Sequence, residues 1–212
     1  MKSRQTGKRT LRTIDKDSFT VKELTETFQE IIGVSDRSTA ILVAALIDSA
    51  LSDLIEAELL TSLGEEDAIK PLYERDGALS TFFSKIHLGY AMSLYDDKVR
   101  DDLEVIRRVR NSFSHVRRSI NFNTPEIVEE CRKLRTMNDH THEVYKIFDR
   151  EGRYDFDELT NRSRFVLTGL SIWLHLMVHA AATHKKFLEA MKAVIENFQA
   201  QRKGQISIKS QQ

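Results

Sequence analysis

Glycine and proline are scarce in this chain, and that scarcity limits the folds open to it. Among 212 residues there are 8 Gly and 2 Pro. All-β folds and glycine-rich nucleotide-binding loops need many such residues at their turns, so the sequence predicts a mostly helical protein. A chain of this length with 41% hydrophobic residues is also long enough for one core of its own. We therefore expect an all-α fold: a single-domain helical bundle.

Apolar residues recur at three- and four-residue spacing, which predicts amphipathic helices. The segment 38–62 is apolar nearly all round at its centre, so we expect it to be the central helix of the core. A long C-terminal helix is predicted over residues 158–201, with a kink near Gly169. Further helices are predicted over residues 20–32, 80–95, 97–119 and 125–138, with a connection at 65–77.

Charge and polarity at the two ends suggest how the chain is divided. Residues 1–19 begin with basic side chains and no acid, so we expect a basic, flexible arm. Residues 20–202 would form the helical domain, and residues 203–212 a flexible polar tail. Candidate contacts to a nucleic-acid backbone in the arm are Lys2, Arg4, Lys8 and Arg9.

Net charge and apolar segments argue against several classes of protein. Lys+Arg and Asp+Glu number 32 each, so the basic surplus of a stand-alone DNA-binding domain is missing. The apolar stretches 40–50 and 166–182 are too short or too polar for a membrane span, and the first residues lack the centre of a signal peptide. The single cysteine, Cys131, excludes an intramolecular disulfide. We expect a cytoplasmic protein without membrane association.

Motifs for bound cofactors or metals are also missing. No G-x-x-x-x-G-K-[ST], G-x-G-x-x-G or G-x-S-x-G string occurs. His175 and His179 have a spacing that can bind zinc, but the Glu of an H-E-x-x-H motif is absent and the neighbours are apolar. We therefore expect no metal site and no small-molecule cofactor.

Residues 105–115, V-I-R-R-V-R-N-S-F-S-H, are the most distinctive candidate for chemistry. Arg107, Asn111 and His115 are four residues apart and share one helical face, with Arg110 on its shoulder. Arg110 and His115 are separated by about 140° of rotation, so a helix end, a kink or a second subunit must bring them together. Arg107 is a further candidate contact to nucleic acid.

Such a group could act on a phosphodiester without a metal ion. His115 could be a general base or acid, Arg110 could bind the phosphate, and Asn111 could orient the substrate or the imidazole. The alternative is architectural, with Arg110 paired to an acid, Asn111 capping a turn and His115 filling a polar corner of the core. Spacing alone favours the architectural alternative.

Four ordered segments resemble the mannitol operon repressor (MltR) family. They are PLYERDGALS (71–80), KIHLGYAMSL (85–94), residues 103–115 and INFNTPEI (120–127). The resemblance covers roughly residues 38–135 and implies an all-helical fold, self-association and a role in regulating transcription. It implies no recognised DNA-binding element, and the sequence contains no convincing helix-turn-helix.

The string Arg110-Asn-Ser-Phe-Ser-His115 is also similar to the Arg-Asn-x-x-x-His motif of the HEPN superfamily. Many HEPN proteins are metal-independent endoribonucleases, often with the site formed across a dimer. The similarity implies that Arg110 and His115 are a catalytic pair with Asn111 as its polar companion. The MltR family tends to diverge at this string, so its presence here favours RNA chemistry.

Three hypotheses follow. The first is an MltR-like regulator, a homodimer that influences transcription through a transcription factor or weak nucleic-acid contacts. The second is a HEPN-type endoribonuclease, a toxin or defence effector. The third is a non-catalytic scaffold. An enzyme should expose Arg110 and His115 in one cleft, a scaffold should bury them fully bonded, and a regulator should leave a partner surface elsewhere.

Overall fold

The computed structural model describes residues 21–63, 66–135 and 159–182, and every regular element in these ranges is a helix. The predicted all-α fold is thus confirmed. The elements are α2 (Val21–Gly33), α3 (Asp36–Leu63), α4 (Glu66–Ile69), the 3₁₀ helix η1 (Lys70–Tyr73), α5 (Phe82–Ala91), α6 (Asp97–His115), α7 (Pro125–Cys131) and α9 (Asn161–Ala182).

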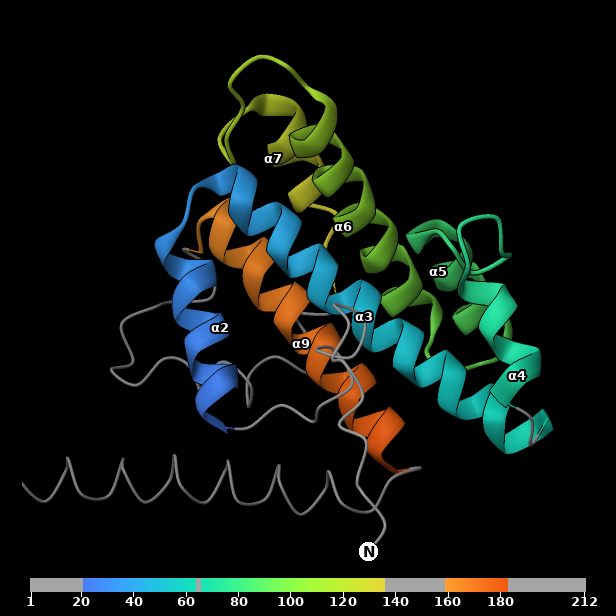
Figure 1. The fold of residues 1–212 in the computed structure, drawn as a ribbon. Helices are drawn as coiled ribbons and strands as arrows, with labels where there is room; N and C mark the ends of the chain where they lie inside the picture. Colours follow the sequence, from blue (N-terminus) through green and yellow to red (C-terminus); the bar gives the residue numbers. More distant parts are fainter. Residues whose placement is uncertain (1–20, 64–65, 136–158, 183–212) are drawn as a thin grey trace, which may run out of the picture.

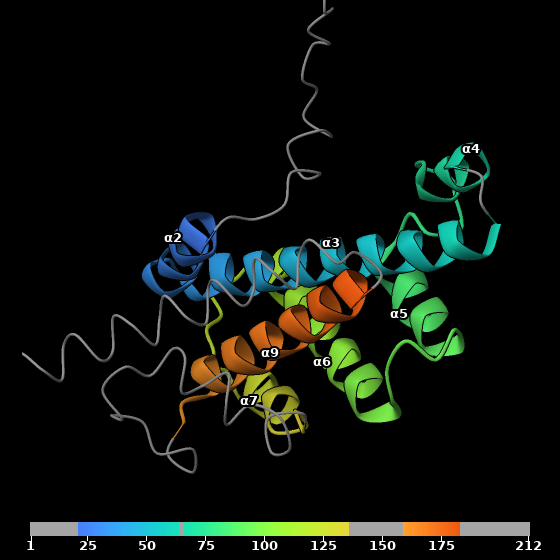
Figure 2. The same ribbon diagram turned by 90° about the horizontal axis from the view of Figure 1, so that it is seen from below.

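Helix α3 is the centre of the bundle, as its apolar pattern predicts. Figure 1 shows α9 and α6 beside it, and Figure 2 shows α2 near its beginning and α4 and α5 near its end. The side chains of Val43, Ile47 and Leu51 are completely buried. One hydrophobic core joins α3 to residues of α2, α5, α6, α7 and α9.

The contact between α3 and α9 depends on a glycine. A Cβ at Gly169 of α9 would overlap Cγ1 of Val43 in α3, so only glycine allows the two helices to come this close. Helix α9 is continuous through Gly169. The sequence predicted a kink near Gly169, whereas in the structure this glycine allows the two helices to pack closely.

One helix in the described part of the chain is long and apolar enough to cross a membrane. It spans Asp36–Leu60, with a mean hydropathy of 1.7, and half of its apolar window is buried within the fold. This segment is most of α3, the core helix of the bundle.

Helix α6 ends four residues before the predicted end at residue 119. Val116 has an extended backbone (φ −72°, ψ 120°), and its amide closes the helix by donating to Ser112 O at 3.1 Å. Arg37 of α3 then donates from Nη2 to the carbonyl oxygens of Val116 (3.0 Å) and Arg118 (3.4 Å). A distant arginine thus holds the chain away from the helical path.

Helix α5 is also shorter than predicted. It begins after Thr81, whose hydroxyl accepts the Ser84 amide at 3.1 Å, and it ends before Ser93, which has a left-handed φ of 59°. Leu94 and Tyr95 then return to the core instead of continuing the helix. The predicted connection 65–77 contains α4 and η1.

The predicted helix 125–138 is likewise too long, because α7 ends at Cys131. The following chain turns back toward α6, and the amide of Arg135 donates to both carboxylate oxygens of the buried Asp102 at 2.9 and 3.1 Å. The arm 1–19, the tail 203–212 and much of the predicted helix 158–201 lie outside the described residues.

A single arginine of α9 holds the turn between α2 and α3. The Nη2 of Arg162 lies 2.9 Å from Thr39 Oγ1, and its Nη1 lies 3.3 Å from Asp36 Oδ1. The same Nη2 is within 2.7 to 3.2 Å of three backbone carbonyl oxygens, those of Ile31, Ile32 and Val34. Carbonyls at a helix end have no partner inside the helix, so Arg162 supplies one.

Candidate functional site

The Arg110-Asn111-His115 motif lies in the last turns of α6. Arg110 and Asn111 are half-buried and His115 is exposed. The Nη1 of Arg110 donates to Asn111 Oδ1 at 2.9 Å. Asn111 and His115 share a helical face, so this bond draws the guanidinium of Arg110 toward the face that carries the imidazole. The sequence predicted that a helix end, a kink or a second subunit must bring Arg110 and His115 together, and this hydrogen bond is none of these.

His115 has a free imidazole within the part of the chain that the structure describes, since it makes no hydrogen bond or ion pair there. The backbone around it is nevertheless fixed, because Phe113 is completely buried in the core and the next amide closes the helix. A fixed backbone with an exposed ring suits a group that binds a ligand or transfers a proton.

The surroundings of this motif are basic. Five arginines and no acid occur between residues 105 and 119. Arg107 forms an ion pair with Glu104 (2.9 Å), and Arg108 with Glu130 (2.9 Å).

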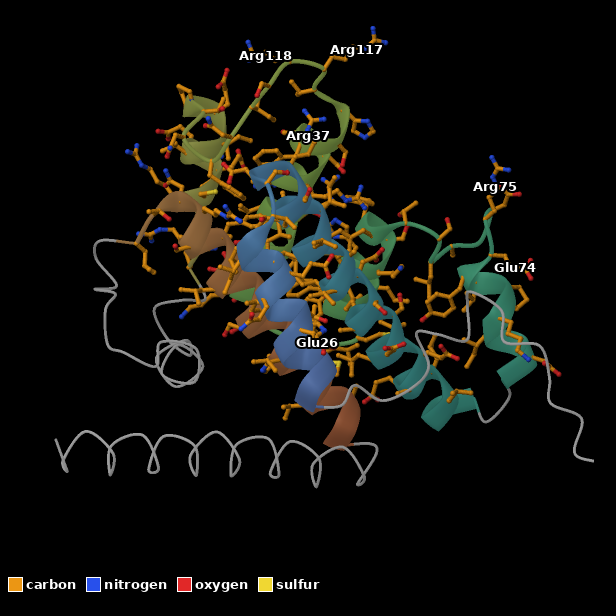
Figure 3. All side chains as sticks on the ribbon, turned by 60° about the vertical axis from the view of Figure 1, so that its left-hand side comes forward. Glu26, Arg37, Glu74, Arg75, Arg117 and Arg118 are labelled. Atoms are coloured by element: carbon orange, nitrogen blue, oxygen red, sulfur yellow. The ribbon has the colours of Figure 1, made fainter. Side chains whose placement is uncertain are left out.

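The other arginines in this region have weaker acidic partners than Arg107 and Arg108, or none among the described residues. Arg118 meets Glu126 only at 3.5 Å between two exposed side chains. Arg110 and Arg117 have no acidic partner among the described residues. Figure 3 shows Arg117 and Arg118 extending from this end of the molecule, with Arg37 nearby. The C-terminal end of α6 therefore carries uncompensated positive charge.

Arg37 is a positioning residue that sequence reasoning missed. Its two hydrogen bonds tie residues 116–118 to the first turn of α3, which fixes the basic segment relative to His115. No local pattern marks Arg37, because its role depends on a contact between residues far apart in sequence.

Next to this site, α5 and α6 form a half-exposed contact that we call the aromatic seam. Its members are Phe83, His87 and Tyr90 of α5 and Arg100, Glu104 and Arg107 of α6. Arg107 Cζ lies 5.2 Å from the ring centroid of Phe83, and Arg100 Cζ lies 4.5 Å from that of Tyr90. Phe83 is 51% exposed and Tyr90 38%.

A second polar cluster joins α5, α3 and η1 and has a structural role. Lys85 is 8% exposed, and its Nζ lies 2.7 Å from Asp48 Oδ1 and donates to Ser52 Oγ at 2.8 Å. The hydroxyl of Tyr73 donates to Ser52 O at 3.2 Å. Burial, together with the nearby carboxylates of Glu56 and Asp53, raises the pKa of Tyr73 above its usual value.

Among the described residues, the histidine pair of α9 belongs to no larger group of ligands. The rings of His175 and His179 are 6.1 Å apart, and His179 Nδ1 lies 3.1 Å from Leu94 O. Within the described ranges, no cluster of three or more His, Cys, Asp or Glu side chains could hold a metal ion.

An apolar pocket of about 210 Å³ lies elsewhere, between α2, α3 and α9. Leu42, Leu46, Trp173 and Met177 provide apolar lining, and Glu30 adds a carboxylate. The pocket is separate from the α6 motif.

The remaining candidate residues from the sequence, Lys2, Arg4, Lys8 and Arg9, lie outside the described residues. Arg107, by contrast, lies beside the motif and is engaged by Glu104. No family model, curated protein or solved structure matches this chain.

Proposed function

We propose that this protein is a regulator that contacts nucleic acid through the C-terminal end of α6. The observation that carries the proposal is the uncompensated positive charge of Arg110 and Arg117 around the exposed His115. Arginines without acidic partners bind phosphate groups and supply most of the affinity for a nucleic-acid backbone. From the resemblance of the sequence to the MltR family we propose that the regulated process is transcription and that the protein is a homodimer. The proposed location is the cytoplasm.

A direct nucleic-acid contact is favoured over action through a protein partner alone. The pocket between α2, α3 and α9 could accept an apolar side chain of a transcription factor, whereas the α6 end combines positive charge with the bidentate donors of arginine. The motif is also unsuited to a purely architectural role. Arg110 and Asn111 bond to each other, and His115 is exposed, so within the described chain these side chains link no two helices.

The test is binding of fluorescently labelled RNA and DNA, measured by anisotropy between 50 and 200 mM KCl. Arg110→Ala and Arg117→Ala should each weaken binding several-fold and reduce the slope of log K against log salt by about 1. Arg132→Ala is the matched control, since Arg132 is exposed directly after α7 but paired with Glu129 at 2.8 Å. Absence of binding by the wild type, or an equal loss in the control, would contradict the proposal.

A second candidate function, metal-independent RNA cleavage, is favoured by one specific observation. The hydrogen bond from Arg110 to Asn111 turns the guanidinium toward the face of His115, and we propose that both groups act on one phosphodiester. His115 would take the proton of a ribose 2′-hydroxyl, and the 2′-oxygen would attack the adjacent phosphorus. The 5′-oxygen would leave with a proton from a water molecule, which produces a 2′,3′-cyclic phosphate. Arg110 would stabilise the negative charge that develops on the phosphate oxygens.

Cleavage is tested in EDTA with purified protein and single-stranded RNA. We expect His115→Ala to lower the rate by roughly 10²- to 10⁴-fold, the range for losing a general base. His179→Ala, a histidine variant on α9, should retain the rate. Cleavage that persists in His115→Ala, or that appears only with added Mg²⁺, would exclude this candidate.

A further inference from the structure

The aromatic seam and the α6 motif lie on one continuous helical face. Arg100, Glu104, Arg107, Asn111 and His115 follow one another at steps of three or four residues, which places them in a single stripe. Helix α5 runs antiparallel to α6, so Phe83 lies beside Arg107 and Tyr90 beside Arg100. Eight residues separate Arg107 from His115, about 12 Å along the helix.

Phe83 is placed in an unusual way for a phenylalanine. Half of its side chain is exposed, although the adjacent Phe82 is buried. Arg107 lies over its ring, and the guanidinium of Arg107 is held in turn by both carboxylate oxygens of Glu104, at 2.9 to 3.3 Å. His87 packs edge-on against the ring at 4.3 Å between centroids. The ring is therefore fixed but still accessible.

We propose that Phe83 and Arg107 form a stacking platform for a base of a single-stranded nucleic acid whose phosphates lie on the C-terminal end of α6. This inference rests on the proposed nucleic-acid contact. Proteins that bind single strands combine a basic groove with aromatic rings on which unpaired bases stack, and arginine adds a cation–π contribution. A base in a duplex is already stacked and paired, so the platform selects single strands.

Charge favours a nucleic acid over a second copy of this chain at Phe83. A symmetric contact centred on Phe83 would bring the α6 arginines of two copies close together, among them Arg110, which has no acidic partner among the described residues, and like charges oppose such an interface. A phosphate backbone meets the same arginines with opposite charge.

The other end of the seam differs in charge and supplies an internal control. Tyr90 is also exposed and also lies under an arginine, Arg100. The carboxylates of Asp96, Asp97 and Asp101 begin α6 there, however, and Asp101 is paired with Arg100 and Arg135. A phosphate backbone is repelled at this end, so Tyr90 should not contact the strand.

The experiment measures binding of an unstructured 12-nucleotide RNA, the matching DNA strand and the matching duplex by fluorescence anisotropy. Every protein carries His115→Ala, so that cleavage cannot alter the probe. Phe83→Ala should weaken single-strand binding about 10-fold, while Phe83→Trp should retain it. Tyr90→Ala should stay within about twofold of the His115→Ala parent, and duplex binding should not respond to Phe83. Circular dichroism confirms folding of each variant.

The outcomes separate this inference from the proposed function. Unchanged single-strand binding in Phe83→Ala, with losses in Arg110→Ala and Arg117→Ala, would overturn the platform and leave the proposed function intact. An equal loss of binding in Tyr90→Ala would also overturn it. So would a Phe83→Ala variant in which only the mass measured by sedimentation changes, because Phe83 would then belong to a protein interface. No binding by any form would overturn both. Equal affinity for RNA and DNA would support a platform that contacts the base alone. A preference for RNA would support a platform whose site also contacts the 2′-hydroxyl.

Discussion

Two helix contacts in this molecule are built in opposite ways. Between α3 and α9, Gly169 meets Val43 and the neighbouring Trp173 and Leu170 are buried, so the contact is apolar and closed. Between α5 and α6, Phe83 and arginine side chains form a contact that remains half-exposed.

The difference shows which contact stabilises the fold and which contact is available for binding. Burial of apolar area supplies most of the folding free energy, and the α3–α9 contact provides it. An exposed aromatic ring under an arginine adds little to stability. Its presence beside a basic helix end supports the proposed role in recognition.

The largest expected effect is on the closed contact. Gly169→Ala should destabilise the protein by about 3 kcal/mol, because the new methyl group overlaps Val43 and a packed core resists added volume. Urea unfolding followed by circular dichroism measures the change, and Val43→Ala in the same chain should restore part of it. If Gly169→Ala stabilised the protein instead, as helix propensity alone predicts, the close approach of α3 and α9 would be refuted.

A polar contact that is buried should behave like the closed contact and not like the seam. Lys85→Met removes the partner of Asp48, whose carboxylate is 28% exposed, and should cost about 2 kcal/mol. Adding Asp48→Leu removes the stranded charge and should recover some of that loss in the same urea assay. A Lys85→Met variant as stable as the wild type would show that the ion pair does not hold α5 to α3.

The seam itself should contribute little to stability. Phe83→Ala should lower the free energy of unfolding by less than about 1 kcal/mol, since the ring is 51% exposed and loses mainly its contact with Arg107. Thermal unfolding of the wild type and of Phe83→Ala, followed side by side, measures this difference in stability. A loss as large as that of Gly169→Ala would remove the contrast between the two contacts.

The smallest effect concerns pH at the contact of α6 with α7. Burial alone would raise the pKa of Glu130, but hydrogen bonds from Lys133 and Arg108 hold it below its usual value. A lowered carboxyl pKa gives stability that is present at neutral pH and lost as the pH falls through the folded-state pKa. Glu130→Gln should therefore cost about 0.5 kcal/mol at pH 7 and nothing below that pKa, measured by urea unfolding at several pH values. A difference that grew toward acid pH would contradict this assignment.

The sequence predicted the central helix well because its signal is local. The apolar pattern of residues 38–62 requires burial on nearly all sides, and the structure places α3 there with an extra turn at most. The end of α6 could not be predicted in the same way. Arg117 and Arg118 are compatible with a helix, and the chain leaves the helical path where Arg37 of another helix binds its carbonyls.

The candidate site shows the same division. Arg110, Asn111 and His115 were found from spacing because one helix carries all three. Phe83 was not singled out, since adjacent phenylalanines at 82 and 83 give no sign of which one faces solvent. The rotation of α5 against α6 decides that, and it follows from packing of the whole bundle.

The capping of α2 by Arg162 has a consequence for how the molecule opens. Arg162 of α9 lies at the carbonyls of Ile31 and Ile32 at the end of this helix, and we expect α2 to detach as a small cooperative unit when that guanidinium moves away. Its amides should exchange with deuterium at a lower free energy than those of α3. Detachment would also remove one wall of the apolar pocket, so we expect the stability of α2, and not that of the core, to set the size of a ligand admitted there.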